Sequence, residues 1–193
     1  MNRELLEARL SELPLYIYAD VDPKNLEFTD RIRWICEHEC PMCNSTWACP
    51  PAVGSVKRCR EKCLSYENCL MISTIAEVYD IADIDETLAT RPAHEAVTNQ
   101  VRDIFREQGV EPYVLSTEAC SICQRCAWLD GEPCRYPDRM HPCVESHGIN
   151  VIPILDEQGL TTFSPYWKVR PCSSRMGITL MPWLSTQGCI RSG

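Results

Sequence analysis

The chain of 193 residues is acidic, with a formal net charge of −8 and 45% hydrophobic residues. The length predicts one domain over residues 1–193 with an ordinary core. The negative charge disfavours a nucleic-acid partner, because phosphate backbones attract basic surfaces. No apolar run approaches the ~20 residues that cross a membrane. The N-terminal sequence MNRELLEARLSELP lacks the apolar centre of a secretory signal, so we expect a cytoplasmic protein. The composition does not indicate an oligomeric state.

The predicted elements alternate between short strands and helices. Apolar and β-branched runs predict strands over residues 15–20, 30–35, 70–79, 112–116, 149–155 and 176–183. Helical spacing and capping residues predict helices over residues 55–66, from 83 or 85 to 109 with a break at Pro92, and from 135 to about 148. This order predicts a two-layer α+β domain with a mixed or antiparallel sheet. The cysteine-rich, cluster-binding loops would lie at one end of the sheet.

The fourteen cysteines fall mainly into two groups. Seven lie between Cys36 and Cys69 and five between Cys120 and Cys143, with Cys172 and Cys189 beyond them. In a cytosolic chain this count indicates metal or redox chemistry more than disulfides. The grouping therefore predicts two coordination regions.

The second group contains the stronger pattern, in the sequence CSICQRCAWLDGEPCRYP. Its four ligand candidates are Cys120, Cys123, Cys126 and Cys134. A compact Cys-x2-Cys-x2-Cys run with a more distant fourth cysteine is typical of [4Fe–4S] sites. Tetrahedral zinc is the alternative, although structural zinc usually takes two separated cysteine pairs. The helix expected after Cys134 would favour the negative charge of a cluster at its N-terminus.

The first group offers a second site in the sequence CEHECPMCNSTWACPP. Its candidates are Cys36, Cys40, Cys43 and Cys49. Cys49 precedes two prolines, as the closing cysteine of many ferredoxin sites precedes a proline. Cys59 and Cys63 follow on one helix face, and either could replace Cys43 as a ligand. The pattern Cys36-x3-Cys40-x2-Cys43 also matches the three-thiol motif of radical S-adenosylmethionine enzymes. That fold needs a long run of βα units after the motif.

Two stretches resemble a known family, the predicted metal-binding proteins of domain of unknown function 2284. One comprises WACPP at residues 47–51 and CLSY at residues 63–66. The other is CSICQRCAWLDGEPCRYPDRMHPCVESHGINV at residues 120–151, where Glu145, Gly148 and Ile149 match a Glu-x-x-Gly-Ile run. The resemblance covers residues 31–183. It implies metal binding at Cys40, Cys49, Cys120, Cys123, Cys126 and Cys134.

This chain departs from the family pattern at two cysteines. Family members usually carry Tyr where this chain has Cys43 and Ser where it has Cys143. The fourth ligand of the first group therefore stays open. The resemblance implies no settled activity. It also implies an anaerobic source, which would suit an oxygen-sensitive cluster.

These observations predict an iron–sulfur protein with one or two [4Fe–4S] clusters, more a redox protein than a stand-alone enzyme. We expect it to pass electrons to or from a partner protein, or to mature that partner. The acidic surface would dock on a basic patch of the partner. The alternatives are a zinc-stapled interaction module without redox function and a radical S-adenosylmethionine-type enzyme.

Overall fold

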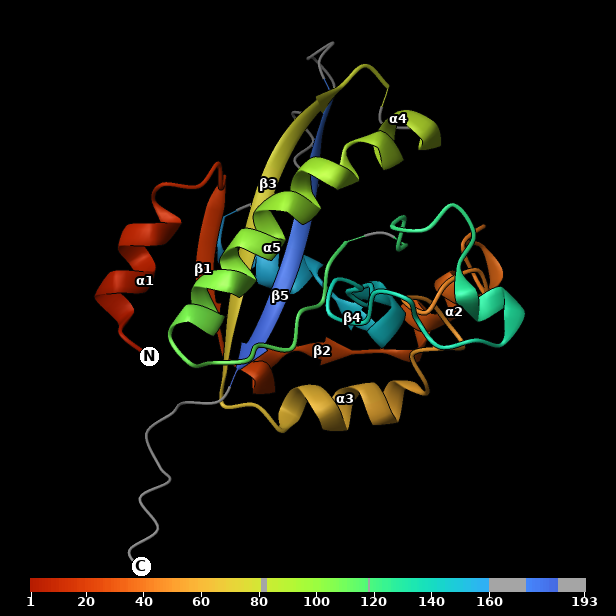
Figure 1. The fold of residues 1–193 in the computed structure, drawn as a ribbon, viewed down its shortest axis with the longest axis horizontal. Helices are drawn as coiled ribbons and strands as arrows, with labels where there is room; N and C mark the ends of the chain where they lie inside the picture. The colour runs from red at the N-terminus through yellow and green to blue at the C-terminus, as the bar shows by residue number, and fades with distance from the viewer. Residues whose placement is uncertain (81–82, 118, 160–172, 184–193) are drawn as a thin grey trace, which may run out of the picture.

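The computed structural model describes residues 1–80, 83–117, 119–159 and 173–183. Its elements follow in the order α1 (Arg3–Leu10), β1 (Ile17–Val21), η1 (Pro23–Asn25), β2 (Glu27–Phe28), α2 (Asp30–His38), α3 (Val56–Leu64), β3 (Asn68–Val78), α4 (Ile84–Ala89), α5 (Arg91–Glu107), η2 (Ala127–Asp130), η3 (Glu145–His147), β4 (Ile149–Asn150), α6 (Ile152–Glu157) and β5 (Ser173–Trp183). Figure 1 shows α5 lying across the main sheet, with α1 on one side and the cysteine-bearing loops on the other.

The main sheet has three antiparallel strands in the order β1–β3–β5. β3 pairs with β5 along its whole length, and Leu70 lies opposite Met181. β1 pairs with the other edge of β3, where Asp20 lies opposite Leu70. A smaller antiparallel pair joins β2 to β4. The central strand β3 is therefore hydrogen-bonded on both edges.

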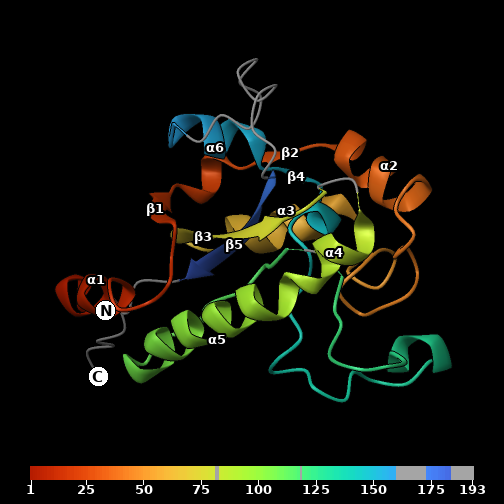
Figure 2. The same cartoon turned by 90° about the horizontal axis from the view of Figure 1, so that it is seen from above.

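Successive residues of β3 enter two different cores, because the side chains of a strand alternate between its faces. Leu70 and Ile72 pack with buried residues of α1 and α5. Met71 packs on the opposite face with residues of β4 and α6. Figure 2 shows α5 on one side of the sheet and α6 with the β2–β4 pair on the other. Burial on both faces fixes the strand register, since a slip by one residue would exchange the two sets.

The α+β class with an antiparallel sheet confirms the prediction from sequence. The strands near residues 15–20, 70–79 and 176–183 are present as β1, β3 and β5. Ser55 caps α3, since its side chain accepts a hydrogen bond from the Arg58 N–H. The predicted break at Pro92 is present as the boundary between α4 and α5, with Pro92 in the first turn of α5.

Three predicted elements are wrong. Residues 30–35 form the start of α2 rather than a strand. The Thr29 side chain accepts a hydrogen bond from the Arg31 N–H, and this cap stabilises the first turn of the helix. Residues 149–155 give only the short β4 followed by α6, and Pro153 occupies the first turn of that helix, where a proline is well tolerated. The predicted strand at 112–116 is reduced to isolated bridges at Leu115 and Ser116.

The helix predicted after Cys134 is also wrong. Residues 135–144 form an irregular loop with short turns and one isolated bridge at Cys143, and only the short η3 precedes Gly148. Pro137 and Pro142 lie within this stretch, and each disfavours helical backbone at the residue before it. No helix dipole therefore follows Cys134. In the described residues, no helix is long and apolar enough to cross a membrane.

Candidate metal centre

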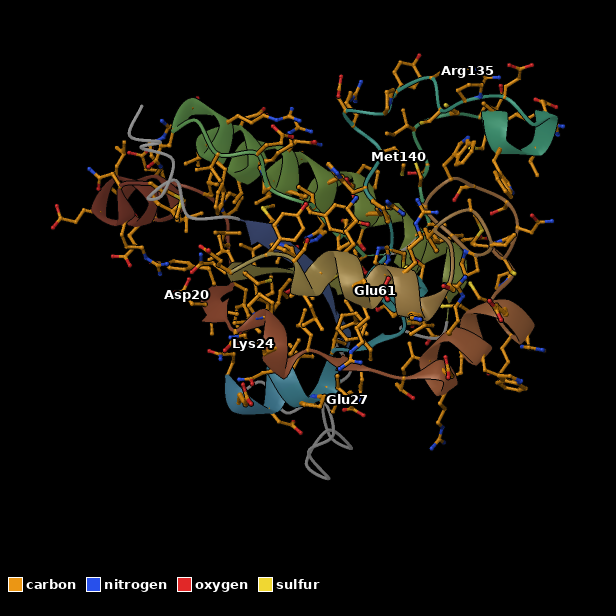
Figure 3. All side chains as sticks on the ribbon, turned by 90° about the horizontal axis from the view of Figure 1, so that it is seen from below. Asp20, Lys24, Glu27, Glu61, Arg135 and Met140 are labelled. Atoms are coloured by element: carbon orange, nitrogen blue, oxygen red, sulfur yellow. The ribbon has the colours of Figure 1, made fainter. Side chains whose placement is uncertain are left out.

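The segment 120–134 brings its four cysteines around one pocket, called here the cysteine pocket. Its lining residues are Cys120, Ile122, Cys123, Cys126, Cys134, Tyr136 and Met140. All four of the cysteines are half-buried. The turn after η2 returns the chain toward its start, since Gly131 adopts a left-handed conformation and the Glu132 N–H donates to the Ala127 carbonyl at 3.0 Å. Figure 3 shows Met140 closer to α5 and Arg135 at the outer rim of this segment.

Burial raises the pKa of the Cys120 thiol, and the neighbouring Cys126 and Cys134 raise it further. The Ile122 N–H and the Arg91 guanidinium lower it. The net raised pKa means that this thiol is protonated at neutral pH when no metal is bound. Because the thiolate is the metal ligand, metal binding here must release protons.

A second cysteine group lies between the end of α2 and the loop before α3. Burial raises the pKa of Cys36 to about 12, with further increases from Glu145, Cys40 and Cys49. Burial also raises the pKa of Cys49, and the neighbouring Cys40 and Cys120 raise it further. Cys36, Cys40 and Cys49 are thus close enough to interact electrostatically. The small raising effect of Cys120 on the pKa of Cys49 indicates that these two thiols lie near each other.

The other cysteines near this loop have different surroundings. The Cys43 thiol lies 3.8 Å from the Pro50 carbonyl oxygen. The Cys59 thiol lies 3.5 Å from the Val53 carbonyl oxygen, and Cys63 is fully buried in the core beside Met71. The electrostatic neighbours of Cys59 are basic side chains, not the cysteines of the loop. The structure therefore groups Cys59 and Cys63 with α3 and its core rather than with the loop thiols.

Two tryptophans join the two cysteine segments. The rings of Trp47 and Trp128 meet edge to face, with centroids 4.8 Å apart and an interplanar angle of 73°. The Trp47 indole N–H donates to the Glu132 carbonyl at 3.1 Å, and the Trp128 indole N–H donates to Asn44 Oδ1 at 2.9 Å. Each tryptophan thus bonds the segment that carries the other. The sequence indicated two aromatics beside cysteines, but not that they pack against one another.

Sequence reasoning missed three charged residues that support the cysteine groups. Arg33, 6% exposed, donates to the carbonyls of Ser146 and Gly54 and so ties α2 to both flanking loops. Glu145 accepts a hydrogen bond from the Cys143 thiol at 2.8 Å and raises the pKa of Cys36. Arg91 lowers the pKa of both Cys49 and Cys120. Only Glu145 had a signal, its place in the family's Glu-x-x-Gly-Ile run.

Comparison with known proteins identifies the family. The family described as predicted metal-binding protein, domain of unknown function 2284, matches residues 19–186. The chain belongs to this family. No curated protein matches the chain, and no solved structure matches it. Membership in this family makes metal binding the expectation for the two cysteine segments, both of which lie inside the matched range.

The donors of the cysteine pocket fit a family of metal-binding proteins. Its described lining offers thiols, two apolar side chains and a tyrosine, and soft thiolates select zinc, copper(I) or iron–sulfur clusters. Among the described residues, no three His, Cys, Asp or Glu side chains converge closely enough to hold a single metal ion. The four thiols line the cysteine pocket together.

Proposed function

We propose that the chain is an iron–sulfur protein that exchanges electrons with a partner protein or matures it. One [4Fe–4S] cluster is held by Cys120, Cys123, Cys126 and Cys134. A second is held by Cys36, Cys40, Cys43 and Cys49. The observation that carries the proposal is the cysteine pocket, which four thiols of one short segment line together. Such clusters supply one-electron chemistry over a wide range of potentials.

The order of the cysteines along the chain supports a cluster over a single zinc ion. A Cys-x2-Cys-x2-Cys run with a more distant fourth cysteine is typical of [4Fe–4S] sites, whereas structural zinc usually takes two separated cysteine pairs. The half-buried position of these cysteines leaves a short path between a cluster and the surface. Cys43, whose thiol lies 3.8 Å from the Pro50 carbonyl oxygen, would be the fourth ligand of the second site.

The relation of the two sites supports electron transfer. Cys49 and Cys120 interact electrostatically, and the Trp47–Trp128 contact holds their segments together. Two clusters at these positions would form a short path for an electron. Large apolar side chains next to the cysteine segments are exposed, among them Trp34 at 50% and Tyr136 at 45%. Exposed apolar side chains beside a redox centre suit a transient protein partner.

The fold argues against a radical S-adenosylmethionine enzyme. That reading requires a run of βα units after Cys43, whereas the strands described after this residue belong to antiparallel pairs. Cys36 lies inside α2 and Cys40 just beyond its end. The first cysteine group is therefore presented by a helix end and a loop, beside an antiparallel sheet.

Anaerobic spectroscopy tests the proposal. The purified protein should be brown, bleach with dithionite, and give an electron paramagnetic resonance signal when reduced. Replacing Cys123 and Cys134 with Ala should remove one signal, and replacing Cys40 and Cys49 should remove the other. A colourless protein with stoichiometric zinc and no signal would contradict the proposal and favour a zinc-stapled module.

A further inference from the structure

A larger pocket opens beside the cysteine pocket, between the first turns of α5 and the cysteine segment. We call it the arginine pocket; its volume is about 270 Å³. Its polar lining is Arg91, Glu95 and Asn99 from α5, facing Cys120, Ser121 and Arg139. Cys120 lines both pockets. A molecule in the arginine pocket would therefore lie directly beside the site formed by Cys120, Cys123, Cys126 and Cys134.

Arg91 is a buried cation with an unsatisfied donor. The residue is 3% exposed, and its Nη2 donates to Glu95 Oε1 at 3.2 Å. Its Nη1 has no hydrogen-bond partner among the described residues. A buried, charged donor without an acceptor is unfavourable, so such a group indicates that an acceptor is supplied by something else. The adjoining pocket is the place from which a ligand can supply it.

The charges around the pocket favour an anion. Among the described lining residues, two guanidinium groups, Arg91 and Arg139, face one carboxylate, Glu95. Glu95 is already engaged, since it accepts hydrogen bonds from both Arg91 and Ser116 Oγ. His141 lies 4.0 Å from the Glu95 carboxylate, but burial and neighbouring arginines lower its pKa to about 4, so it is neutral at pH 7. The positive end of the α5 dipole also points toward this region.

The remaining polar side chain from α5 does not compete for the ligand. Asn99 Nδ2 donates to the Glu95 carbonyl at 2.7 Å, and Asn99 Oδ1 accepts from Arg102 at 2.5 Å. Arg139 is exposed at the opposite wall, and its guanidinium lies 6.0 Å from the Tyr136 ring. Among the described lining residues, this leaves the two guanidinium groups and the Ser121 hydroxyl as donors for a ligand.

We propose that the arginine pocket binds a small oxyanion, a carboxylate or phosphate group, between Arg91 and Arg139. The planar fork of donors on arginine matches both of these groups. The volume of about 270 Å³ lies below the range of about 300–1,000 Å³ that holds drug-sized ligands, so the ligand is a small metabolite rather than a nucleotide. The position of the bound anion beside a redox cluster rests on the proposed function. The binding of the anion does not depend on that function.

Calorimetric titration of the anaerobically purified protein tests the site. Inorganic phosphate and malonate serve as probes, each compared with chloride at equal ionic strength. We expect one of the two probes to bind, and its identity tells phosphate from carboxylate. Arg139→Gln, at an exposed position, should weaken that binding at least tenfold. Arg125→Gln is the matched control, because Arg125 is exposed and paired with Asp130 away from the pocket, and it should change binding less than twofold.

Three results would overturn the site. They are no binding of either probe, an equal loss in the Arg125 control, and an Arg91→Gln variant that folds and binds as tightly as the parent. The last would assign the Arg91 charge to the cysteine groups alone. If a cluster is present, the probe should also alter its electron paramagnetic resonance signal, and Arg139→Gln should abolish that change. A protein without a cluster would refute the proposed function, while the calorimetric result would still decide the anion site.

Discussion

Truncating the tryptophan pair should uncouple the two cysteine segments. Trp47 and Trp128 are half-buried, meet edge to face at 4.8 Å, and each donates a hydrogen bond to the opposite segment. Replacing either with Ala removes the shared ring contact and one of the two hydrogen bonds. Replacing both removes the same ring contact only once. The double variant should therefore lose less stability than the sum of the single variants.

The size of this difference follows from the contact. An aromatic pair contributes about 0.5–1.5 kcal/mol beyond the area it buries, and a hydrogen bond contributes about 1 kcal/mol. Each single variant should lose about 2–3 kcal/mol, below the range for a fully buried tryptophan because these rings are half-buried. The interaction energy from the double-mutant cycle should be about 1 kcal/mol.

Urea unfolding under anaerobic conditions, followed by far-ultraviolet circular dichroism, measures the cycle. Trp34 provides the control, because it is 50% exposed and stacks on His38 rather than on the other cysteine segment. A cycle of Trp34→Ala with Trp128→Ala should be additive within about 0.5 kcal/mol. An additive result for Trp47 with Trp128 would refute the docking of the two segments.

Three further predictions concern stability and metal content. In thermal unfolding, Gly148→Ala should lower the free energy of unfolding by about 3 kcal/mol and Gly131→Ala by about 1 kcal/mol. Both glycines have positive φ, but only at Gly148 would a Cβ meet a carbonyl oxygen, at 3.0 Å. Equal losses of stability in the two variants would contradict this. Burial lowers the pKa of both His147 and His141 to about 4, so each should contribute a loss of about 3 kcal/mol as pH falls from 6.5 to 4. In a pH series of urea midpoints, His147→Gln should remove its own share of this loss and leave that of His141. Cys134→Ala should lower the iron content of the purified protein, because Cys134 lines the cysteine pocket. Cys69→Ala, in the core, should reduce stability but leave the iron content unchanged. Iron loss in both variants would show that Cys134→Ala acts by destabilising the fold rather than by removing a ligand.

The sign of the acid effect follows from the direction of the shift. A histidine whose folded pKa is depressed takes up a proton more readily when the chain is unfolded. Between pH 6.5 and 4 the unfolded state therefore binds more protons, and acid favours unfolding. The loss is complete once the pH falls below the folded pKa of about 4. The Tyr113 hydroxyl lies 2.7 Å from His147 Nε2 in the neutral state.

The strands that carry a two-sided apolar core were predictable from sequence. β3 contains an unbroken apolar run because its residues fill cores on both faces of the sheet. Such a run predicts a buried strand even when the strands that pair with it are unknown. Short elements were not predictable, because apolar runs of six residues suit strand and helix alike. Residues 30–35 and 149–155 illustrate this: the cap at Thr29 favours helix α2, and Pro153 occupies the first turn of α6.

The four cysteines of the second group that the spacing singled out line one pocket, because they lie close together in one short segment. The sequence did not show that Cys49 lies near Cys120, because that proximity depends on the Trp47–Trp128 contact between distant segments. It also did not reveal Arg91, which lies in an ordinary amphipathic helix. Its unsatisfied Nη1 is visible only when the packing around it is known.

Counting iron and acid-labile sulfide in the anaerobically purified protein tests the central claim most directly. Two [4Fe–4S] clusters predict about eight of each per chain, and one cluster predicts about four. Equal amounts of iron and sulfide at either level would support thiols that surround a polynuclear centre. One zinc ion per chain, with neither iron nor sulfide, would contradict it.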